Sequence, residues 1–162
     1  MKKTCIFIVG KGKTGKSSIV RGLTGCWCDC FWQVTDLSGN RILAMVLLSA
    51  IGERPPVSSE NFVVELEAQV RKKKRNKGFS DNYSLIICPI RPRPAKRFIE
   101  AALRLDLDVK VAGIETAWNG QQPNLYGIGD WCVQKSIPYL PLNTSNDYNP
   151  EAGRIRQTFY PK

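Results

Sequence analysis

The stretch GKGKTGKSS, residues 10–18, follows the apolar run Cys5–Val9 and decides the fold that the sequence predicts. It matches the pattern G-x-x-x-x-G-K-[ST] at every fixed position, with Lys16 and Ser17 as the last two residues of the match. The apolar run before it is typical of a buried parallel strand, and Ser18–Leu23 after it is typical of the first turns of a helix. Strand, glycine loop and helix in that order are the context that a phosphate-binding loop requires.

Each residue type in this loop suits a phosphate chain. Glycines let the backbone turn tightly and bring its N–H groups close to phosphate oxygens. The Lys16 ammonium can contact the β- and γ-phosphates, and the Ser17 hydroxyl can ligate a Mg²⁺ ion that bridges them. The alternative interpretation is a glycine-rich turn with solvated lysines. We predict ATP and Mg²⁺ as cofactors, with GTP not excluded, bound by Gly10, Lys11, Gly12, Lys13, Thr14, Gly15, Lys16, Ser17 and Ser18.

Apolar runs alternate with helical patterns along the rest of the chain. This alternation predicts an α/β fold, a mainly parallel twisted sheet with helices on both faces, and the length of 162 residues predicts a single domain, residues 1–162. Arg41–Leu48 stays open between strand and helix, and Asn124–Lys135 between loop and short helix. The other expected strands are Cys5–Val9, Phe31–Thr35, Tyr83–Pro89, Val109–Ile114 and Ile137–Leu142, and the expected helices are Lys16–Gly25, Ser58 or Ser59 to about Lys74, Pro94–Leu105 and a C-terminal helix from Pro150.

The chain carries a net charge of +10, much of it in two basic runs. These are RKKKRNK, residues 71–77, and RPRPAKR, residues 91–97. A basic face favours phosphate-bearing partners, either nucleic acid or an anionic lipid surface. The alternative is a solvated helix end, because cations are also favourable at the C-terminus of a helix.

Other features of the sequence limit the classes of protein to which the chain can belong. No apolar run approaches the ~18 residues of a membrane span, and Met-Lys-Lys followed only by TCIFIV is not a secretory signal, so we expect a cytoplasmic protein with no transmembrane segment. Histidine is absent, which excludes histidine-based catalysis and histidine metal sites. Cys26, Cys28 and Cys30 could hold a soft metal ion, but the spacing rules for zinc sites favour simple packing of thiols.

Register for register, GKGKTGKSS resembles the GKGGVGKTT loop of the ParA/MinD family of deviant Walker A ATPases. In that family the lysine directly after the first glycine, here Lys11, reaches across a nucleotide-sandwich dimer to the phosphates of the partner subunit. The resemblance therefore implies a small, divergent member of the family that acts as a Mg-ATP-dependent homodimer switch in DNA partitioning or positioning. Lys13 stands where the family loop has a glycine.

Three later segments extend this resemblance in order along the chain. VTDLSGN, residues 34–40, resembles the switch I pattern D-x-D-P-Q-G-N, and Asp36 aligns with the aspartate that orients the attacking water. YSLIICPIRP resembles the Walker B strand, with Ile87 in place of the acid. VAGIETA ends in Ala117 where the family has an adenine-contacting asparagine. The resemblance thus implies Lys11 and Asp36 as catalytic residues, with weak ATP hydrolysis because Ile87 cannot hold the water shell of Mg²⁺.

Three other classes stay open. A small GTPase would use residues 36–39 as a D-x-x-G switch, but NTSND, residues 143–147, does not fit the guanine pattern N-K-x-D. A P-loop kinase would use RPRPAKR as an arginine-rich lid. A nucleotide-gated binding module without hydrolysis would fit Ile87 at the Walker B position.

Overall fold

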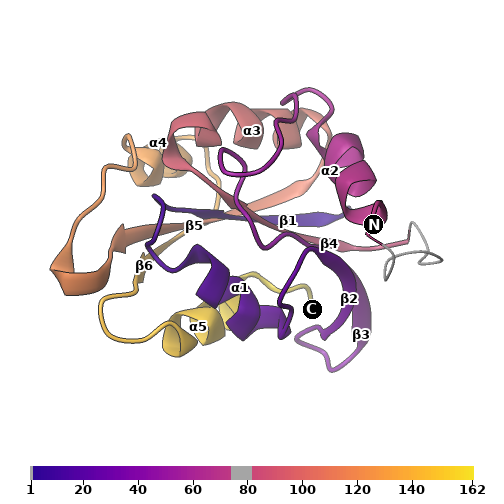
Figure 1. Cartoon of the computed structure of the whole chain (residues 1–162), viewed down its shortest axis with the longest axis horizontal. Helices are drawn as coiled ribbons and strands as arrows, with labels where there is room; N and C mark the ends of the chain where they lie inside the picture. The colour runs from indigo at the N-terminus through magenta and orange to yellow at the C-terminus, as the bar shows by residue number, and fades with distance from the viewer. Residues whose placement is uncertain (1, 74–81) are drawn as a thin grey trace.

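The computed structural model describes residues 2–73 and 82–162, which build one six-stranded sheet in the order β2-β3-β4-β1-β5-β6 (Figure 1). All neighbouring strands run parallel except the pair β2–β3, which is antiparallel. The strands are β1 (Thr4–Val9), β2 (Cys30–Thr35), β3 (Arg41–Val46), β4 (Leu85–Ile90), β5 (Asp108–Thr116) and β6 (Tyr139–Asn143).

Helices cover both faces of the sheet. The helices α1 (Lys16–Thr24) and α5 (Asn149–Phe159) lie on one face, and α2 (Phe62–Arg71), α3 (Pro92–Arg104) and α4 (Ile128–Gln134) lie on the other (Figure 1). A 3-10 helix, Trp118–Gly120, follows β5. The expected α/β fold, with a mainly parallel sheet between helices, is therefore confirmed.

The central strand β1 shows why this sequence forms a buried sheet. All six of its residues are buried, and successive side chains point to opposite faces. Cys5, Phe7 and Val9 pack with the core under α2, α3 and α4, whereas Ile6 and Ile8 pack with the core under α1 and α5. Burial on both sides explains why the run is continuously apolar instead of alternating.

The structure corrects several expected boundaries. Arg41–Leu48, which the sequence left open, begins with strand β3. The expected cap of α2 at Ser58 or Ser59 is wrong, because α2 begins after Asn61, and Ser58 instead donates to the Glu65 carboxylate. The helix α3 begins two residues before the expected Pro94, with Pro92 in its first turn. Lys74, the expected end of α2, lies outside the described residues.

Strand direction divides the sheet into two ends that matter for function. At the loop end, β1, β3, β4, β5 and β6 finish and β2 begins. At the turn end, residues 36–40 join β2 to β3 and the other strands begin. In parallel α/β sheets, ligands bind beyond the carboxyl ends of the strands, which here is the loop end.

Candidate phosphate-binding site

The loop of residues 10–15 leaves β1 at the loop end and enters α1 directly. Its first residue, Gly10, donates its N–H to the carbonyl of Ile90 at the end of β4, 3.1 Å away. Gly15 has φ +102°, and Lys13 has φ +62°, in the left-handed region that glycine occupies most readily. Lys13 therefore holds a glycine-like conformation at the position where the ParA/MinD loop has a glycine.

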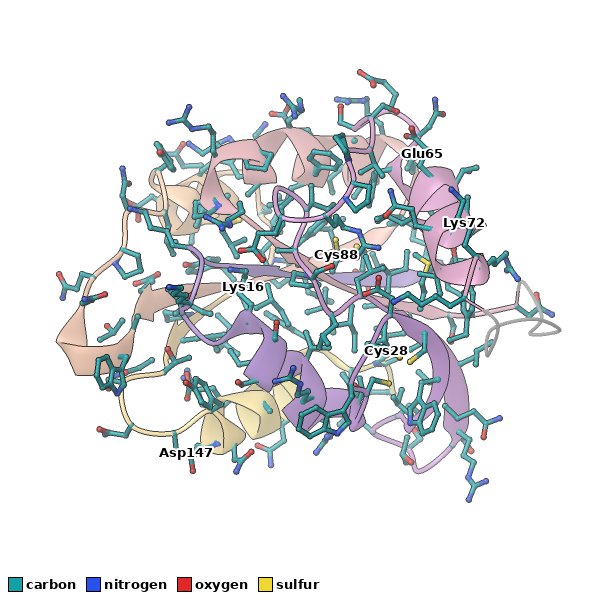
Figure 2. The ribbon with its side chains drawn as sticks, in the orientation of Figure 1. Lys16, Cys28, Glu65, Lys72, Cys88 and Asp147 are labelled. Carbon is teal, nitrogen blue, oxygen red and sulfur yellow. The ribbon has the colours of Figure 1, made fainter. Side chains whose placement is uncertain are left out.

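Lys16 occupies the first turn of α1 and points back over the loop (Figure 2). Its Nζ donates to the carbonyl of Lys11 at 2.6 Å, and the hydroxyl of Thr14 donates to the same oxygen at 2.6 Å. The Lys16 side chain is only 5% exposed. Burial lowers its pKa below the ordinary value, and the nearby Glu53 carboxylate opposes that shift.

Two charged side chains that the sequence did not place at this site meet the lysine. The Glu53 carboxylate lies 3.4 Å from Lys16 Nζ and 2.5 Å from Arg91 Nε. Burial acts to raise the pKa of Glu53, but the charges of Lys16 and Arg91 outweigh it and hold the pKa below its ordinary value. Glu53 follows β3 and Arg91 follows β4, so strand order brings them to the loop.

Ser17 and Asp29 are linked through the backbone of one residue, Leu48. The Ser17 hydroxyl donates to the Leu48 carbonyl at 3.2 Å, and the Leu48 N–H donates to the Asp29 carboxylate at 2.7 Å. Asp29 also pairs with Arg54 at 2.9 Å and with Lys73 at 3.5 Å. Burial raises the pKa of Asp29, but the Leu48 N–H and Arg54 more than offset it, and the net shift is downward. A buried acid thus lies close to the predicted Mg²⁺ ligand.

The connection between β6 and α5 closes the loop from the other side. The hydroxyl of Thr144 donates to the Thr14 carbonyl at 2.8 Å in a buried contact. The ring of Tyr148 lies against Gly15, where a Cβ atom would collide with it. The loop is therefore supported by β6–α5 as well as by β1 and α1.

The predicted loop residues thus lie together at one end of the sheet. Lys11 and Lys13 are exposed, so Lys11 is free of burial, as a lysine acting across a dimer would need to be. Ser18 is half-buried in the first turn of α1. The roles of these residues toward a nucleotide remain predictions.

The structure places Asp36 away from the loop, against the catalytic role that the resemblance implied. β2 is antiparallel, so Asp36 lies at the turn end, where its carboxylate accepts the N–H groups of Ser38 and Asn40 at 2.9 and 2.8 Å. Thr4, the first residue of β1, and Ala44 of β3 both pair with Leu85 of β4, so they lie at the same height in the sheet. Asp36 lies farther toward the turn end than Ala44 does. The loop begins after Val9, more than about 16 Å away at about 3.3 Å per strand residue. The D-x-x-G interpretation of residues 36–39 fails for the same reason.

The other two motif positions lie inside the core. Ile87 is fully buried in β4 on the α1–α5 face, and it pairs in register with Ile6, three residues before the end of β1. Ala117 is buried after β5. Neither side chain can ligate an ion or a base, and an acid at Ile87 would lie within the apolar core.

The three neighbouring thiols lie together but away from the loop. Cys26 Sγ and Cys30 Sγ are 3.0 Å apart in a buried contact, and Cys28 is half-buried on the connection from α1 to β2 (Figure 2). All six cysteines lie within the described residues, and each is a thiol outside any disulfide. Over residues 2–73 and 82–162, no group of three or more histidine, cysteine or acidic side chains is placed to hold a metal ion. The packing of Cys26 and Cys30 in the core under α1 agrees with the interpretation as structural thiols.

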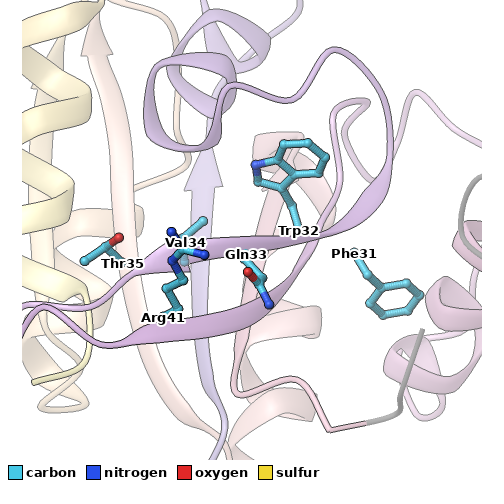
Figure 3. Close-up of a pocket in the computed structure, with 6 residues that line it drawn as sticks. All are labelled: Phe31, Trp32, Gln33, Val34, Thr35 and Arg41. Carbon is cyan, nitrogen blue, oxygen red and sulfur yellow. The ribbon is translucent and has the colours of Figure 1, made fainter.

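A hollow runs along β2, the outer strand of the sheet. It measures about 540 Å³ and is lined by Phe31, Trp32, Gln33, Val34, Thr35 and Arg41 (Figure 3). Trp32 is 49% exposed there. Among the described residues that line the hollow, Arg41 is the only charged one, whereas Lys16, Glu53 and Arg91 meet at the loop.

The described residues of the two basic runs divide into paired and exposed side chains. Lys73 pairs with Asp29 and Arg91 with Glu53, whereas Lys72, Arg93 and Arg97 are exposed. Residues 74–77 of the first run lie outside the described residues. Binding of nucleic acid or an anionic surface through residues 71–77 and 91–97 stays a prediction. Among the helices that the structure describes, none combines the length and apolar character needed to cross a membrane.

Comparison with known proteins adds no functional assignment. No protein-family model and no curated protein matches the chain. One solved structure that is similar in outline is the solution NMR structure of a de novo designed protein, at 12% identity and a TM-score of 0.45, covering 97% of this chain and 89% of the designed one. A similarity at that level carries no argument, so the function must be argued from the loop and its neighbours.

Proposed function

We propose that this chain binds a Mg²⁺-nucleoside triphosphate at residues 10–18, with ATP as the expected nucleotide and GTP as the alternative. The observation that supports this proposal most directly is the buried Lys16 ammonium, which points over a glycine loop at the carboxyl end of β1. The loop also lies at the N-terminus of α1, whose dipole favours an anion.

The residues around the loop suit a magnesium ion bound together with phosphates. Magnesium prefers oxygen ligands and keeps several waters when it binds next to a phosphate chain. Ser17 would offer its hydroxyl in place of its present bond to the Leu48 carbonyl, and the N–H of the same residue donates to the Asp29 carboxylate. The ion would neutralise charge between the phosphates, while Lys16 and the loop amides orient them.

We further propose that the protein is a nucleotide-gated switch with weak hydrolysis, similar in outline to ParA/MinD ATPases. Neither acid position of that family is filled at this site, since Ile87 is buried and Asp36 lies at the turn end. Slow or absent turnover therefore fits the site better than efficient catalysis. The exposed Lys11 would support nucleotide-dependent association of two copies, because facing phosphate chains repel each other unless cations lie between them.

Calorimetric titration of the wild type and of Lys16→Ala with non-hydrolysable ATP and GTP analogues in Mg²⁺ tests the binding proposal. Lys16→Ala should lose about a hundredfold or more in affinity, because hydrogen bonds between charged groups contribute about 1.5–3 kcal/mol each. Lys2→Ala, at the turn end, is the matched control and should bind as the wild type does. Equal affinity of the wild type and Lys16→Ala would exclude the phosphate-loop assignment.

Sedimentation of the same proteins with the better-bound analogue tests the switch. Lys11→Ala should keep most of the affinity but lose nucleotide-dependent dimerisation. Since Lys13 is also exposed on the loop, the double variant of Lys11 and Lys13 should be compared as well. A wild type that stays monomeric with bound nucleotide at tens of micromolar protein would reject the dimer.

A further inference from the structure

We propose that Glu53 occupies the phosphate position of the loop when no nucleotide is bound, and that Arg91 binds the phosphate of the ligand after the carboxylate has been displaced. This inference rests on the proposed function and deepens it. It names the class of ligand as a polyphosphate anion that competes with a carboxylate from the same chain. It also assigns to Arg91 a phosphate contact within one subunit, in addition to any contact from Lys11 of a second copy.

The position of the Glu53 carboxylate is the first argument. It lies between two cations, 3.4 Å from Lys16 Nζ and 2.5 Å from Arg91 Nε. In a phosphate loop the same lysine ammonium contacts the phosphate chain. A carboxylate and a phosphate oxygen make the same charge-assisted hydrogen bonds to lysine and arginine, so one anion can replace the other.

The fixed position of Arg91 above the loop is the second argument. The Arg91 N–H donates to the Ile51 carbonyl at 2.9 Å, and the Ile51 N–H donates to the Pro89 carbonyl at 3.0 Å, so a short parallel bridge ties residues 51–53 to the end of β4. The guanidinium then reaches the loop, where a Cβ atom on Gly12 would lie 2.8 Å from Arg91 Nη2. Its stem passes Gly52, where a Cβ atom would lie 2.7 Å from Arg91 Cγ.

Lys16, Glu53 and Arg91 differ in how far their side chains are exposed to solvent. Lys16 is 5% exposed, whereas Glu53 is 28% and Arg91 is 42% exposed in their side chains. A ligand can therefore reach Arg91 and Glu53 from solvent, while Lys16 is buried and contacts the Glu53 carboxylate. Moving the partly exposed Glu53 carboxylate into water would break its two ion pairs, but its hydration would offset part of that loss, and the move would leave two cations facing the incoming phosphates.

A purely structural ion pair makes a different prediction. If Glu53 only stabilises the loop, its removal should weaken binding by loosening Lys16 and Arg91. If Glu53 competes with the ligand, its removal should strengthen binding, because the phosphates no longer have to break two ion pairs. The direction of the change in affinity therefore distinguishes the two roles.

The test measures the affinity of the full chain for inorganic tripolyphosphate and for a Mg²⁺-ATP analogue, by calorimetry at low salt. Tripolyphosphate carries no base or ribose, so it reports on the phosphate position alone. We expect Glu53→Gln to bind tripolyphosphate about tenfold more tightly than the wild type, and Arg91→Ala to bind about tenfold more weakly. Arg93→Ala, an exposed arginine two residues later, is the matched control and should leave both affinities unchanged.

The variants also allow a test of coupling and of folding. In the double variant of Glu53 and Arg91, the gain in affinity from Glu53→Gln and the loss in affinity from Arg91→Ala should not add, because the two side chains contact each other. Glu53→Asp, whose shorter side chain cannot reach both cations, should give a smaller gain than Glu53→Gln, and its thermal melting reports whether the fold is intact.

The outcomes separate this inference from the proposed function. Binding that is lost in Lys16→Ala but is not tighter in Glu53→Gln, or not weaker in Arg91→Ala, overturns the inference and leaves the phosphate loop standing. Binding that does not depend on Lys16 in any background overturns the proposed function, and the inference with it.

Discussion

Asp29 at the loop end of the sheet and Asp36 at the turn end both accept hydrogen bonds from backbone N–H groups, but the two carboxylates serve different structures. Asp29, at the loop end, is about 10% exposed and joins Leu48, Arg54 and Lys73. The Asp36 carboxylate, at the turn end, accepts the N–H groups of Ser38 and Asn40 in its own turn. Position at the end of parallel strands, and not likeness to a motif, distinguishes an acid near the proposed phosphate site from an acid that shapes a turn.

Removing each aspartate in turn gives the largest expected difference between the two ends. Asp29→Ala should lower the free energy of unfolding by about 3 kcal/mol, because it leaves the buried Arg54 guanidinium without its carboxylate. Chemical denaturation of the purified variant measures this loss. Asp29→Asn keeps the shape and an acceptor for Leu48, so it should cost less and serves as the matched control.

The stability of the wild type and of Asp29→Asn should depend differently on acid pH. The folded pKa of Asp29 lies below its ordinary value of 3.8, so its charge contributes stability that is present above that value and is lost as pH falls through the folded pKa. Unfolding measured from pH 6 to pH 2 should show a shallower acid decline for Asp29→Asn than for the wild type. Identical pH profiles would show that Asp29 is not a stabilising charge.

Two glycines give a second, smaller contrast. Gly15 at the loop end and Gly39 at the turn end both have positive φ, +102° and +88°. Each substitution to alanine should cost about 1 kcal/mol for the left-handed backbone. Gly15→Ala should cost more than this and should weaken nucleotide binding, because its Cβ meets the Tyr148 ring, whereas nothing lies within 4 Å of a Cβ at Gly39.

Thermal melting and titration of the two alanine variants measure this contrast. Combining Gly15→Ala with Tyr148→Ala removes the collision and should restore part of the stability and affinity, which identifies the ring as the cause. If Gly39→Ala were the more damaging substitution for binding, the loop end would not be the ligand site.

The local part of this molecule was predictable from sequence because it depends on short-range patterns. The strand before the loop, the loop and the start of α1 follow from an apolar run, fixed glycines and a helical pattern within residues 5–24. The sequence also predicted helices on both faces from the alternation of strands and helices. These features need no knowledge of how distant segments pair.

The position of Asp36 was not predictable while residues 41–48 stayed open between strand and helix. Once β3 is known, only five residues join it to β2, and a connection that short can only form an antiparallel hairpin. The hairpin then carries residues 36–40 to the turn end. The resemblance to switch I assumed that β2 ends next to the loop. Because residues 41–48 were not assigned as a strand, the antiparallel direction of β2 was missed.

Glu53, Arg91 and Asp29 were missed at the site for a different reason. Glu53 lies in the irregular segment between β3 and α2, which has no periodic pattern, and its place depends on the bridge between Ile51 and Ile90. Arg91 was interpreted only as part of a basic run. Asp29 lies among Cys26, Cys28 and Cys30, and that segment was interpreted only through its thiols. Only the strand order brings these three residues to one end of the sheet.

The smallest expected effect is that of Asp36→Ala, and it is the sharpest test of the distinction between the two ends. The variant should lose about 1 kcal/mol of stability, since its carboxylate accepts two N–H groups in an exposed turn. It should leave nucleotide affinity and any hydrolysis rate unchanged, because more than the length of β1 separates it from the loop. Asp36→Asn is the matched control, because asparagine can form the same turn and should restore the stability. A steady-state phosphate-release assay on wild type, Asp36→Ala and Asp36→Asn decides the matter. A clear fall in rate that appears in both variants, while the melting temperature of Asp36→Asn equals that of the wild type, would mean that Asp36 reaches a nucleotide after all. That result would require a second copy to bring its turn end to the loop of the first. The sedimentation experiment would then detect a dimer that still forms in Lys11→Ala.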